Sequence, residues 1–109
     1  MKLVKAIVRT NKLEAVKDAL TRLNVTGMTV TEVRGHGRQR GHKAIYRGTE
    51  YNVTLLPKIM IELVISDELV DDCIKTIIET ARTGEIGDGR VFIFPVETGY
   101  NIRTGERDV

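Results

Sequence analysis

The basic, glycine-punctuated stretch at residues 35–39 is the part of the sequence best suited to binding an anion. It reads Gly-His-Gly-Arg-Gln. Because glycine has no Cβ, successive backbone N–H groups can line a concave anion site, to which the Arg38 guanidinium adds a forked positive charge. The spacing matches neither a dinucleotide-binding fingerprint nor a P-loop, which needs Gly-Lys-Ser/Thr at the start of a helix. The stretch predicts an anion-wrapping turn, and a flexible basic hairpin is the alternative that composition supports equally.

A second stretch, residues 83–90, is called the glycine loop below and reads Thr-Gly-Glu-Ile-Gly-Asp-Gly-Arg. Gly87 and Gly89 allow the backbone to approach phosphate oxygens, and Arg90 can pair with them. Asp88 could hold a ribose hydroxyl, an N–H group of the other loop, or nothing. Taken alone, the stretch is better explained as a helix-to-strand connection. Because both loops are expected to leave the sheet at neighbouring strand ends, they could converge on one polyphosphate.

The side chains do not form a recognisable catalytic arrangement. His36 and His42 lie in the basic stretch without a carboxylate to orient them, and two histidines alone make a poor metal site. Cys73 falls on the apolar stripe of an expected helix, which predicts a buried, inert thiol. Tyr46 and Tyr51 suit contact with a partner protein, with covalent modification as the alternative. The sequence predicts a binding protein and not an enzyme.

Four strands and two helices are expected to position these stretches. Residues 1–9, 28–33, 58–65 and 91–96 show the alternating or β-branched pattern of strands. Apolar residues at helical spacing predict one helix between the first two strands and another at residues 66–81. The apolar positions of the two helices are Leu13, Val16, Leu20 and Leu23, then Val70, Cys73, Ile74, Ile77 and Ala81.

Local signals mark the helix starts and the tail. Asn11 with Glu14 three residues later has the pattern of a capping box, and Ser66 followed by two acidic residues predicts a second cap. A short strand is expected at residues 100–103 of the polar tail. Arg103, taken alone, is more typical of a solvated side chain.

The order βαββαβ predicts an α+β fold of the ferredoxin-like type, with two helices on one face of an antiparallel sheet. The chain, residues 1–109, is expected to be one domain with a long loop at about 36–57 and a C-terminal segment at 98–109. Two helices cover only one face of the sheet, yet Met60 and Val64 place apolar side chains on the other. This pattern predicts a closed homo-oligomer without fixing the number of subunits.

Composition narrows the function classes. The chain has 109 residues, 41% of them hydrophobic, and a net charge of +2, which is too small to indicate nucleic acid as an obligatory partner. A single cysteine allows no internal disulfide. Apolar runs fall short of the ~18 residues needed to span a bilayer, and a signal-peptide pattern is missing. We expect a cytoplasmic protein that neither binds nucleic acid nor inserts into a membrane.

Several segments together resemble the PII family of nitrogen-regulatory signal transducers. Residues 46–51, Tyr-Arg-Gly-Thr-Glu-Tyr, and residues 83–92 resemble the two signature segments of that family. Further segments that fit the family are 28–35, 37–42, 56–58 and 102–106. The resemblance implies a homotrimer that binds ATP or ADP in three clefts between subunits.

The resemblance also implies which residues form the nucleotide site. They would come from the base of the long loop, the strands near the adenine, the glycine loop and the tail of a neighbouring subunit. These residues are Ile7, Thr29, Gly35, Gly37, Arg38, Gln39, Glu62, Leu63, Val64, Gly87, Asp88, Gly89, Arg90 and, from the neighbour, Arg103.

By the same resemblance, 2-oxoglutarate would bind beside Mg-ATP. Gln39 would coordinate Mg²⁺, and Lys58 would pair with a carboxylate of the effector. The 2-oxoglutarate site would consist of Gly37, Gln39, Arg40, Gly41, Lys58 and Gly87. The long loop would be the T-loop of the family, whose shape reports the bound effector to an ammonium transporter or to enzymes of nitrogen metabolism. Tyr51 occupies the position that is uridylylated or adenylylated in some relatives.

The sequence departs from the family pattern at a few positions. Asn101 stands where the family commonly has Arg, which predicts weaker ATP binding. The other departures are Thr10-Asn11 at the first helix and His36, Thr49 and Thr54 in or beside the long loop. These changes bear on the choice of partner more than on the fold.

Two other classes could use a ferredoxin-like fold. A phosphotransferase or nucleotide-binding enzyme would need His36 or His42 at the terminal phosphate of its substrate. An RNA-binding module would carry aromatic residues on its central strands. Here Phe92 and Phe94 belong to the last strand, so the sequence favours neither class.

Overall fold

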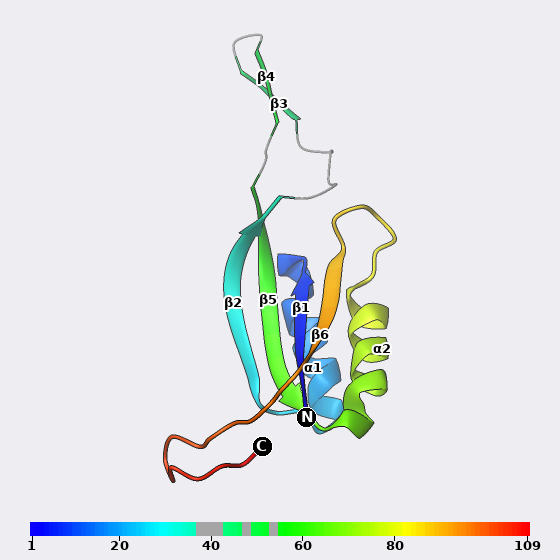
Figure 1. Cartoon of the computed structure of the whole chain (residues 1–109). Coiled ribbons are helices and arrows are strands. Elements are labelled where there is room, and N and C mark those ends of the chain that lie inside the picture. The colour runs from blue at the N-terminus through cyan, green and yellow to red at the C-terminus, as the bar shows by residue number, and fades with distance from the viewer. Residues whose placement is uncertain (37–42, 47–48, 53–54) are drawn as a thin grey trace.

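The four expected strands form one antiparallel sheet with the order β2-β5-β1-β6 (Figure 1). They are β1 (Lys2–Val8), β2 (Met28–Gly35), β5 (Leu56–Ile65) and β6 (Gly89–Pro95). The structure is a computed structural model and describes residues 1–36, 43–46, 49–52 and 55–109. β2 ends two residues later, and β5 begins two residues earlier, than the sequence predicts. The sheet therefore extends further toward the long loop than expected.

Both helices pack on the same face of this sheet (Figure 1). α1 spans Leu13–Arg22, α2 spans Val70–Ala81, and the two helices contact each other. Two strand-helix-strand units that share an antiparallel sheet make the ferredoxin-like arrangement. The predicted fold class is confirmed.

The hydrophobic core lies between the helices and the sheet, and its residues follow the predicted periodicities. Alternate residues of β1 and β5 point into it, as expected for strands with one buried face. On α2, Val70 and Ile74 of the predicted stripe are only partly buried. The core consists of Val4, Ala6, Val8, Val16, Leu20, Val25, Ile59, Ile61, Leu63, Ile65, Cys73, Ile77 and Ala81.

The predicted helix caps are wrong. A short 3-10 turn precedes each helix, η1 (Thr10–Lys12) before α1 and η2 (Asp67–Leu69) before α2, and no side-chain cap hydrogen bond forms at the described start of either element. Asn11 lies inside η1. Ser66 occupies the cap position of η2 but accepts the Leu69 N–H, 3.0 Å away, through its carbonyl oxygen. The 3-10 turns supply backbone bonds where capping side chains were expected.

Neither helix covers the opposite face of the sheet. Residues directly opposite each other in an antiparallel ladder share a face, and Lys5 lies opposite both Glu62 and Phe92. The Lys5 Nζ lies 4.0 Å from the Glu62 carboxylate and 5.3 Å from the centroid of the Phe94 ring. Val64, on the same face, is 43% exposed. Exposed apolar side chains beside a partly buried ion pair are typical of a surface that another subunit covers.

The long loop and the tail differ from the sequence-based description. Within the long loop, β3 (Lys43–Tyr46) and β4 (Thr49–Asn52) pair with each other as a separate two-stranded sheet. The prediction of a short strand at residues 100–103 is wrong. The tail instead folds into a small hairpin with a single bridge between Tyr100 and Arg107, closed by a 2.8 Å hydrogen bond from the Asn101 N–H to the Glu106 carbonyl.

Candidate functional site

One end of the sheet gathers several of the residues that the sequence singled out. Strand register places Gly35, the last residue of β2, opposite Leu56 at the start of β5. It also places Val8, the last residue of β1, opposite both Ile59 of β5 and Gly89 at the start of β6. The base of the long loop and the glycine loop therefore leave the sheet at the same end.

Gly89 fixes the glycine loop to β1 through a close backbone approach. Its φ is +108°, and a Cβ built on it would lie 1.7 Å from the Ile7 carbonyl oxygen. A residue with a side chain would clash there and would be strained by the positive φ. Glycine at this position is explained by packing against β1.

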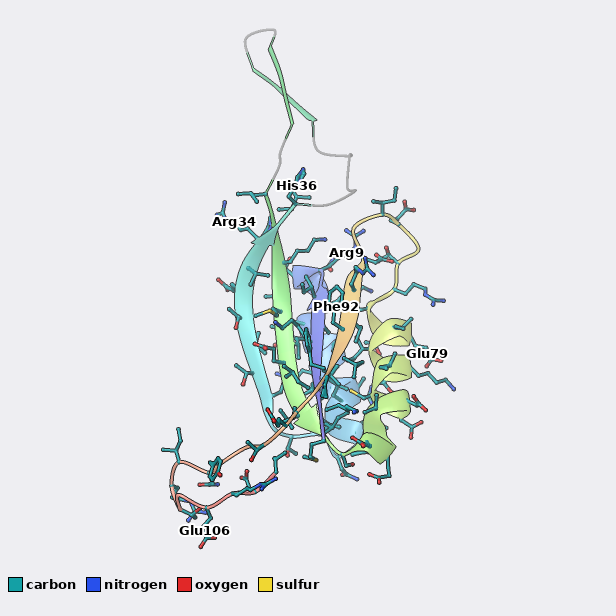
Figure 2. The ribbon with its side chains drawn as sticks, viewed as in Figure 1. Arg9, Arg34, His36, Glu79, Phe92 and Glu106 are labelled. Carbon is teal, nitrogen blue, oxygen red and sulfur yellow. The ribbon has the colours of Figure 1, made fainter. Side chains whose placement is uncertain are left out.

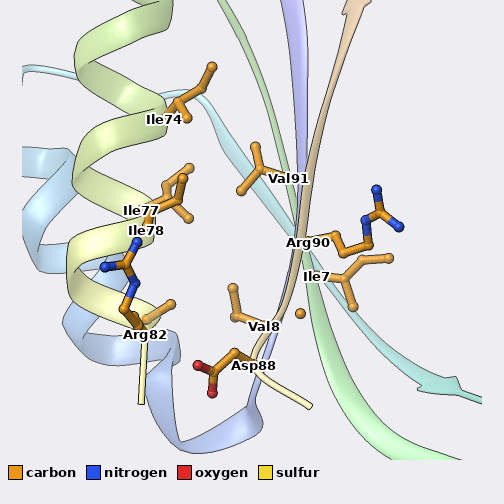
Figure 3. Close-up of a pocket in the computed structure, with 11 residues that line it drawn as sticks. Ile7, Val8, Ile74, Ile77, Ile78, Arg82, Asp88, Arg90 and Val91 are labelled. Atoms are coloured by element: carbon orange, nitrogen blue, oxygen red, sulfur yellow. The ribbon is translucent and has the colours of Figure 1, made fainter. Parts of the chain in front are cut away.

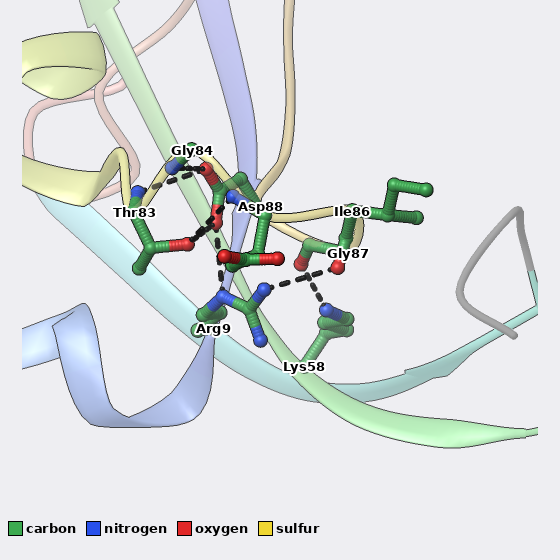
Figure 4. A network of polar contacts seen from close by, with 8 residues as sticks. Arg9, Lys58, Thr83, Gly84, Ile86, Gly87 and Asp88 are labelled. Carbon is green, nitrogen blue, oxygen red and sulfur yellow. Dashed lines mark hydrogen bonds and ion pairs between the residues drawn. The ribbon is translucent and has the colours of Figure 1, made fainter. Parts of the chain in front are cut away.

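The Asp88 carboxylate organises the glycine loop (Figure 4). It accepts hydrogen bonds from the Arg9 Nε at 3.0 Å, the Thr83 N–H at 2.8 Å and the Gly84 N–H at 2.9 Å, and from the Thr83 hydroxyl. The bonds from Thr83, together with those from Arg9 and Gly84, hold the pKa of Asp88 well below its ordinary value. Asp88 is therefore ionised throughout the physiological range.

Two cations reach the carbonyl oxygens of the same loop (Figure 4). The Arg9 Nη2 donates to the Ile86 carbonyl at 3.1 Å, and the Lys58 Nζ donates to the Gly87 carbonyl. Burial, and after it the nearby Arg9 charge, lowers the pKa of Lys58. Lys58 is the partly buried third residue of β5 and follows directly the long loop expected at about residues 36–57. The contact therefore joins β5, just after the long loop, to the glycine loop. Most of the basic stretch at residues 35–39 lies outside the described residues.

An apolar cavity of about 290 Å³ lies beside this end of the sheet, between α2 and β6 (Figure 3). Ile74, Ile77 and Ile78 of α2 line one side, and Val91 of β6 lines the other. Arg90 points away from α2 in Figure 3, and its guanidinium lies 5.2 Å from the centroid of the Phe92 ring. Arg82, Asp88 and the backbone of Gly89 also line the cavity, so its mouth borders the glycine loop.

Comparison with known proteins identifies the family. The family model described as nitrogen regulatory protein P-II matches residues 1–106. The chain belongs to the P-II family. Nitrogen regulatory protein P-II of Klebsiella oxytoca and P-II 1 of Escherichia coli K12 are each 55% identical to it over 108 residues. The protein of Haemophilus influenzae is 53% identical, and all three alignments cover 99% of this chain and 96% of the relative.

Membership in the P-II family gives the protein a role as a signal transducer in nitrogen regulation. These relatives are named as regulatory proteins. Across the described ranges, no group of three or more His, Cys, Asp or Glu side chains could hold a metal ion. Over the same ranges, the helices are too short or too polar to cross a membrane.

The adenine-side residues expected from the P-II resemblance lie further along the sheet. Thr29 of β2 is directly opposite Glu62 of β5, so both belong to the face that the helices leave free. Val64 is on that face too. Leu63 points the other way and is 2% exposed, so only its backbone can contact a ligand. Ile7 lies opposite Arg90, next to the glycine loop.

Arg103 is not brought to the glycine loop within one chain. It belongs to the tail hairpin, and Figure 2 shows Glu106 of that hairpin at the opposite end of the molecule from Arg9. Tyr51 lies in β4. Several expected site residues lie outside the described residues, namely Gly37, Arg38, Gln39, Arg40 and Gly41.

Sequence reasoning missed two residues of this site, Arg9 and Thr83. Both contact Asp88, and Arg9 is separated from it by 79 positions in the chain. The available signal for Arg9 was its place as the last residue of the first predicted strand, at a strand end. Thr83 carried no signal beyond its place at the start of the glycine loop.

Proposed function

We propose that the chain is a homotrimeric P-II signal transducer that senses ATP, ADP and 2-oxoglutarate. In the cytoplasm, it would use the long loop to regulate proteins of nitrogen assimilation, such as an ammonium channel. Nucleotide would bind at the glycine loop, and 2-oxoglutarate beside it near Lys58. Tyr51 is the proposed modification position.

The contact between Lys58 and the Gly87 carbonyl carries this proposal. It joins the base of the long loop to the glycine loop, so a ligand that displaces the contact acts on both loops at once. Lys58 and Arg90 provide positive charge at this sheet end, which suits phosphate or carboxylate groups. Mg²⁺, when bound, would neutralise phosphate charge, and Gln39 is the proposed ligand.

Two observations support a trimer with shared sites. The sheet face that carries Val64 and Phe94 is partly apolar and is not covered by the helices. Arg103 lies in a hairpin remote from the glycine loop of its own chain, so its proposed contact with nucleotide needs a neighbouring subunit. A trimer would cover the face and supply the arginine.

Signalling would follow from differential affinity of the ligands for two shapes of the long loop. A ligand shifts such an equilibrium only by the difference in its affinity for the two states. ATP with 2-oxoglutarate would engage Lys58 and stabilise one shape. ADP lacks the terminal phosphate, so the other shape would become available to a different partner.

Calorimetric titration of the full chain tests the proposal. We expect ATP and ADP to bind, and 2-oxoglutarate to bind only in the presence of Mg-ATP. Lys58→Ala should abolish 2-oxoglutarate binding and leave ADP binding nearly intact, because Lys58 is proposed to pair with the effector carboxylate. Lys75→Ala removes an exposed lysine of α2 and is the matched control.

Undiminished affinity of the Lys58→Ala variant for 2-oxoglutarate would overturn the effector site. Absence of ATP and ADP binding in the wild-type chain would overturn the sensing role altogether. The partner is tested by retention of the chain on a reconstituted ammonium channel. Retention should differ between ADP and Mg-ATP with 2-oxoglutarate, and equal retention under both conditions would count against signalling to a channel.

A further inference from the structure

The hydrogen-bonding capacity of the Asp88 carboxylate is already used within the chain. An ionised carboxylate offers about four acceptor positions on its two oxygens. Oδ1 accepts from the Arg9 Nε at 3.0 Å and from the Thr83 hydroxyl, and Oδ2 accepts from the Thr83 and Gly84 N–H groups at 2.8 and 2.9 Å. A nucleotide hydroxyl would have to displace one of these donors to reach the side chain.

These donors come from the start of the glycine loop, Thr83 and Gly84, and from Arg9, which follows β1 directly. The acceptor, Asp88, lies near the other end of the loop, so its carboxylate ties the two ends together and to β1. Arg9 makes a second contact inside the loop, from its Nη2 to the Ile86 carbonyl at 3.1 Å. The Thr83 hydroxyl also accepts a hydrogen bond from the Glu85 N–H at 3.1 Å, which adds a bond within the first three residues of the loop.

We infer that Arg9, Thr83 and Asp88 form a brace that holds the glycine loop in its ligand-binding shape, and that Asp88 is a positioning residue whose side chain does not contact the nucleotide. The inference rests on the proposed nucleotide site. A loop that is already ordered loses less conformational freedom when ligand binds, so the brace raises affinity without touching the ligand. Arg9 also neutralises the Asp88 charge, which would otherwise repel phosphate.

Amide hydrogen exchange of the ligand-free protein, followed by NMR, tests the brace without any nucleotide. Asp88→Asn should speed exchange of the Thr83 and Gly84 amides several-fold, because both amides lose a charged acceptor. Glu85→Gln removes a carboxylate from the same loop and is the matched control, with unchanged exchange at both amides. Unchanged exchange in Asp88→Asn would overturn the brace.

Calorimetry with ADP then separates positioning from direct contact. Thr83→Val removes the hydroxyl that bonds Asp88 while keeping a β-branched side chain of similar size. We expect Thr83→Val and Asp88→Asn each to weaken ADP binding about tenfold, the order expected for loss of one hydrogen bond to a charged group. Thr83→Ser keeps the hydroxyl and should bind like the wild type.

The double variant completes the test. If both side chains act through one brace, Thr83→Val combined with Asp88→Asn should bind ADP no more weakly than Asp88→Asn alone. Additive losses, or a loss in Asp88→Asn with wild-type affinity in Thr83→Val, would show that Asp88 contacts the ligand directly and would overturn the inference.

If the wild type fails to bind ADP, the proposed function fails, and the exchange experiment still decides whether the brace exists. Should Asp88→Asn fail to fold, Thr83→Val and Thr83→Ser provide the same comparison.

Discussion

At the scale of the residue, Gly89 gives the sharpest prediction. Gly89→Ala should lower the free energy of unfolding by at least about 3 kcal/mol, because the new methyl group would overlap the Ile7 carbonyl oxygen at a φ of +108°. Urea denaturation followed by circular dichroism measures the change. Gly27→Ala is the control, since a Cβ there meets nothing within 4 Å and the effect should stay within about 1 kcal/mol. Equal stability of the two variants would contradict the close approach.

Cys73 leads to a prediction about reactivity and pH. The side chain is fully buried, and burial raises the pKa of the thiol to about 11. At pH 8 the folded protein should therefore react with a disulfide reagent only as fast as it unfolds. Because an unfolded thiol ionises near 8.5, this group should also lower the stability of the fold as pH rises from about 8.5 to 11. A burst of labelling in the native protein, at concentrations of urea too low to unfold it, would contradict this assignment.

Residue types could be read from the sequence, but their partners could not. Glycine and arginine at the ends of two strands indicated a candidate phosphate site, because phosphate binding needs exposed backbone and positive charge. The role of Asp88 stayed open among three alternatives. Its partner Arg9 is 79 positions away, and only the pairing of β1 with β6 brings the two residues together.

At the scale of the element, neighbouring positions of α2 test the buried stripe. Ile77 is 1% exposed and Ile78 is 38% exposed. Ile77→Ala should lower the free energy of unfolding by about 3 kcal/mol, since it removes buried apolar contacts and leaves a cavity. Ile78→Ala should cost less than about 1 kcal/mol. Thermal or chemical unfolding of both variants gives the comparison, and similar losses would mean that the helix is rotated relative to this description.

Periodicity predicted the elements well, because burial on one face leaves a pattern of apolar residues in each strand and helix. Predictions that depended on a single capping side chain were wrong. Asn11 and Ser66 were expected to cap helices, but η1 and η2 provide backbone bonds instead. The tail hairpin was also missed, since its backbone bonds around Asn101 and Glu106 do not require an apolar pattern.

At the scale of the whole molecule, the free sheet face links the fold to the proposed assembly. Lys5 and Glu62 form an ion pair there, at 4.0 Å and with each side chain about a third exposed. Another subunit that covers this face would remove water from both charges. Because an unpaired buried charge is costly, the Lys5–Glu62 pair should stay intact in the assembly. Exposed Val64 and Phe94 beside it supply apolar area for the contact. The order of elements therefore predicts an assembly surface, and the trimer is the proposed number of subunits.

The assembly surface can be tested with two matched valines. Val64 and Val30 are both 43% exposed and lie on adjacent strands, but register places Val64 opposite Leu3 on the free face and Val30 opposite Ile61 on the helix side. Val64→Glu should convert the proposed trimer of 12.2 kDa chains into monomers, because assembly would bury an unpaired carboxylate. Val30→Glu should leave the oligomer intact. Sedimentation equilibrium measures the mass of each variant, and a trimeric Val64→Glu protein or a monomeric wild type would show that the subunits do not meet through this face.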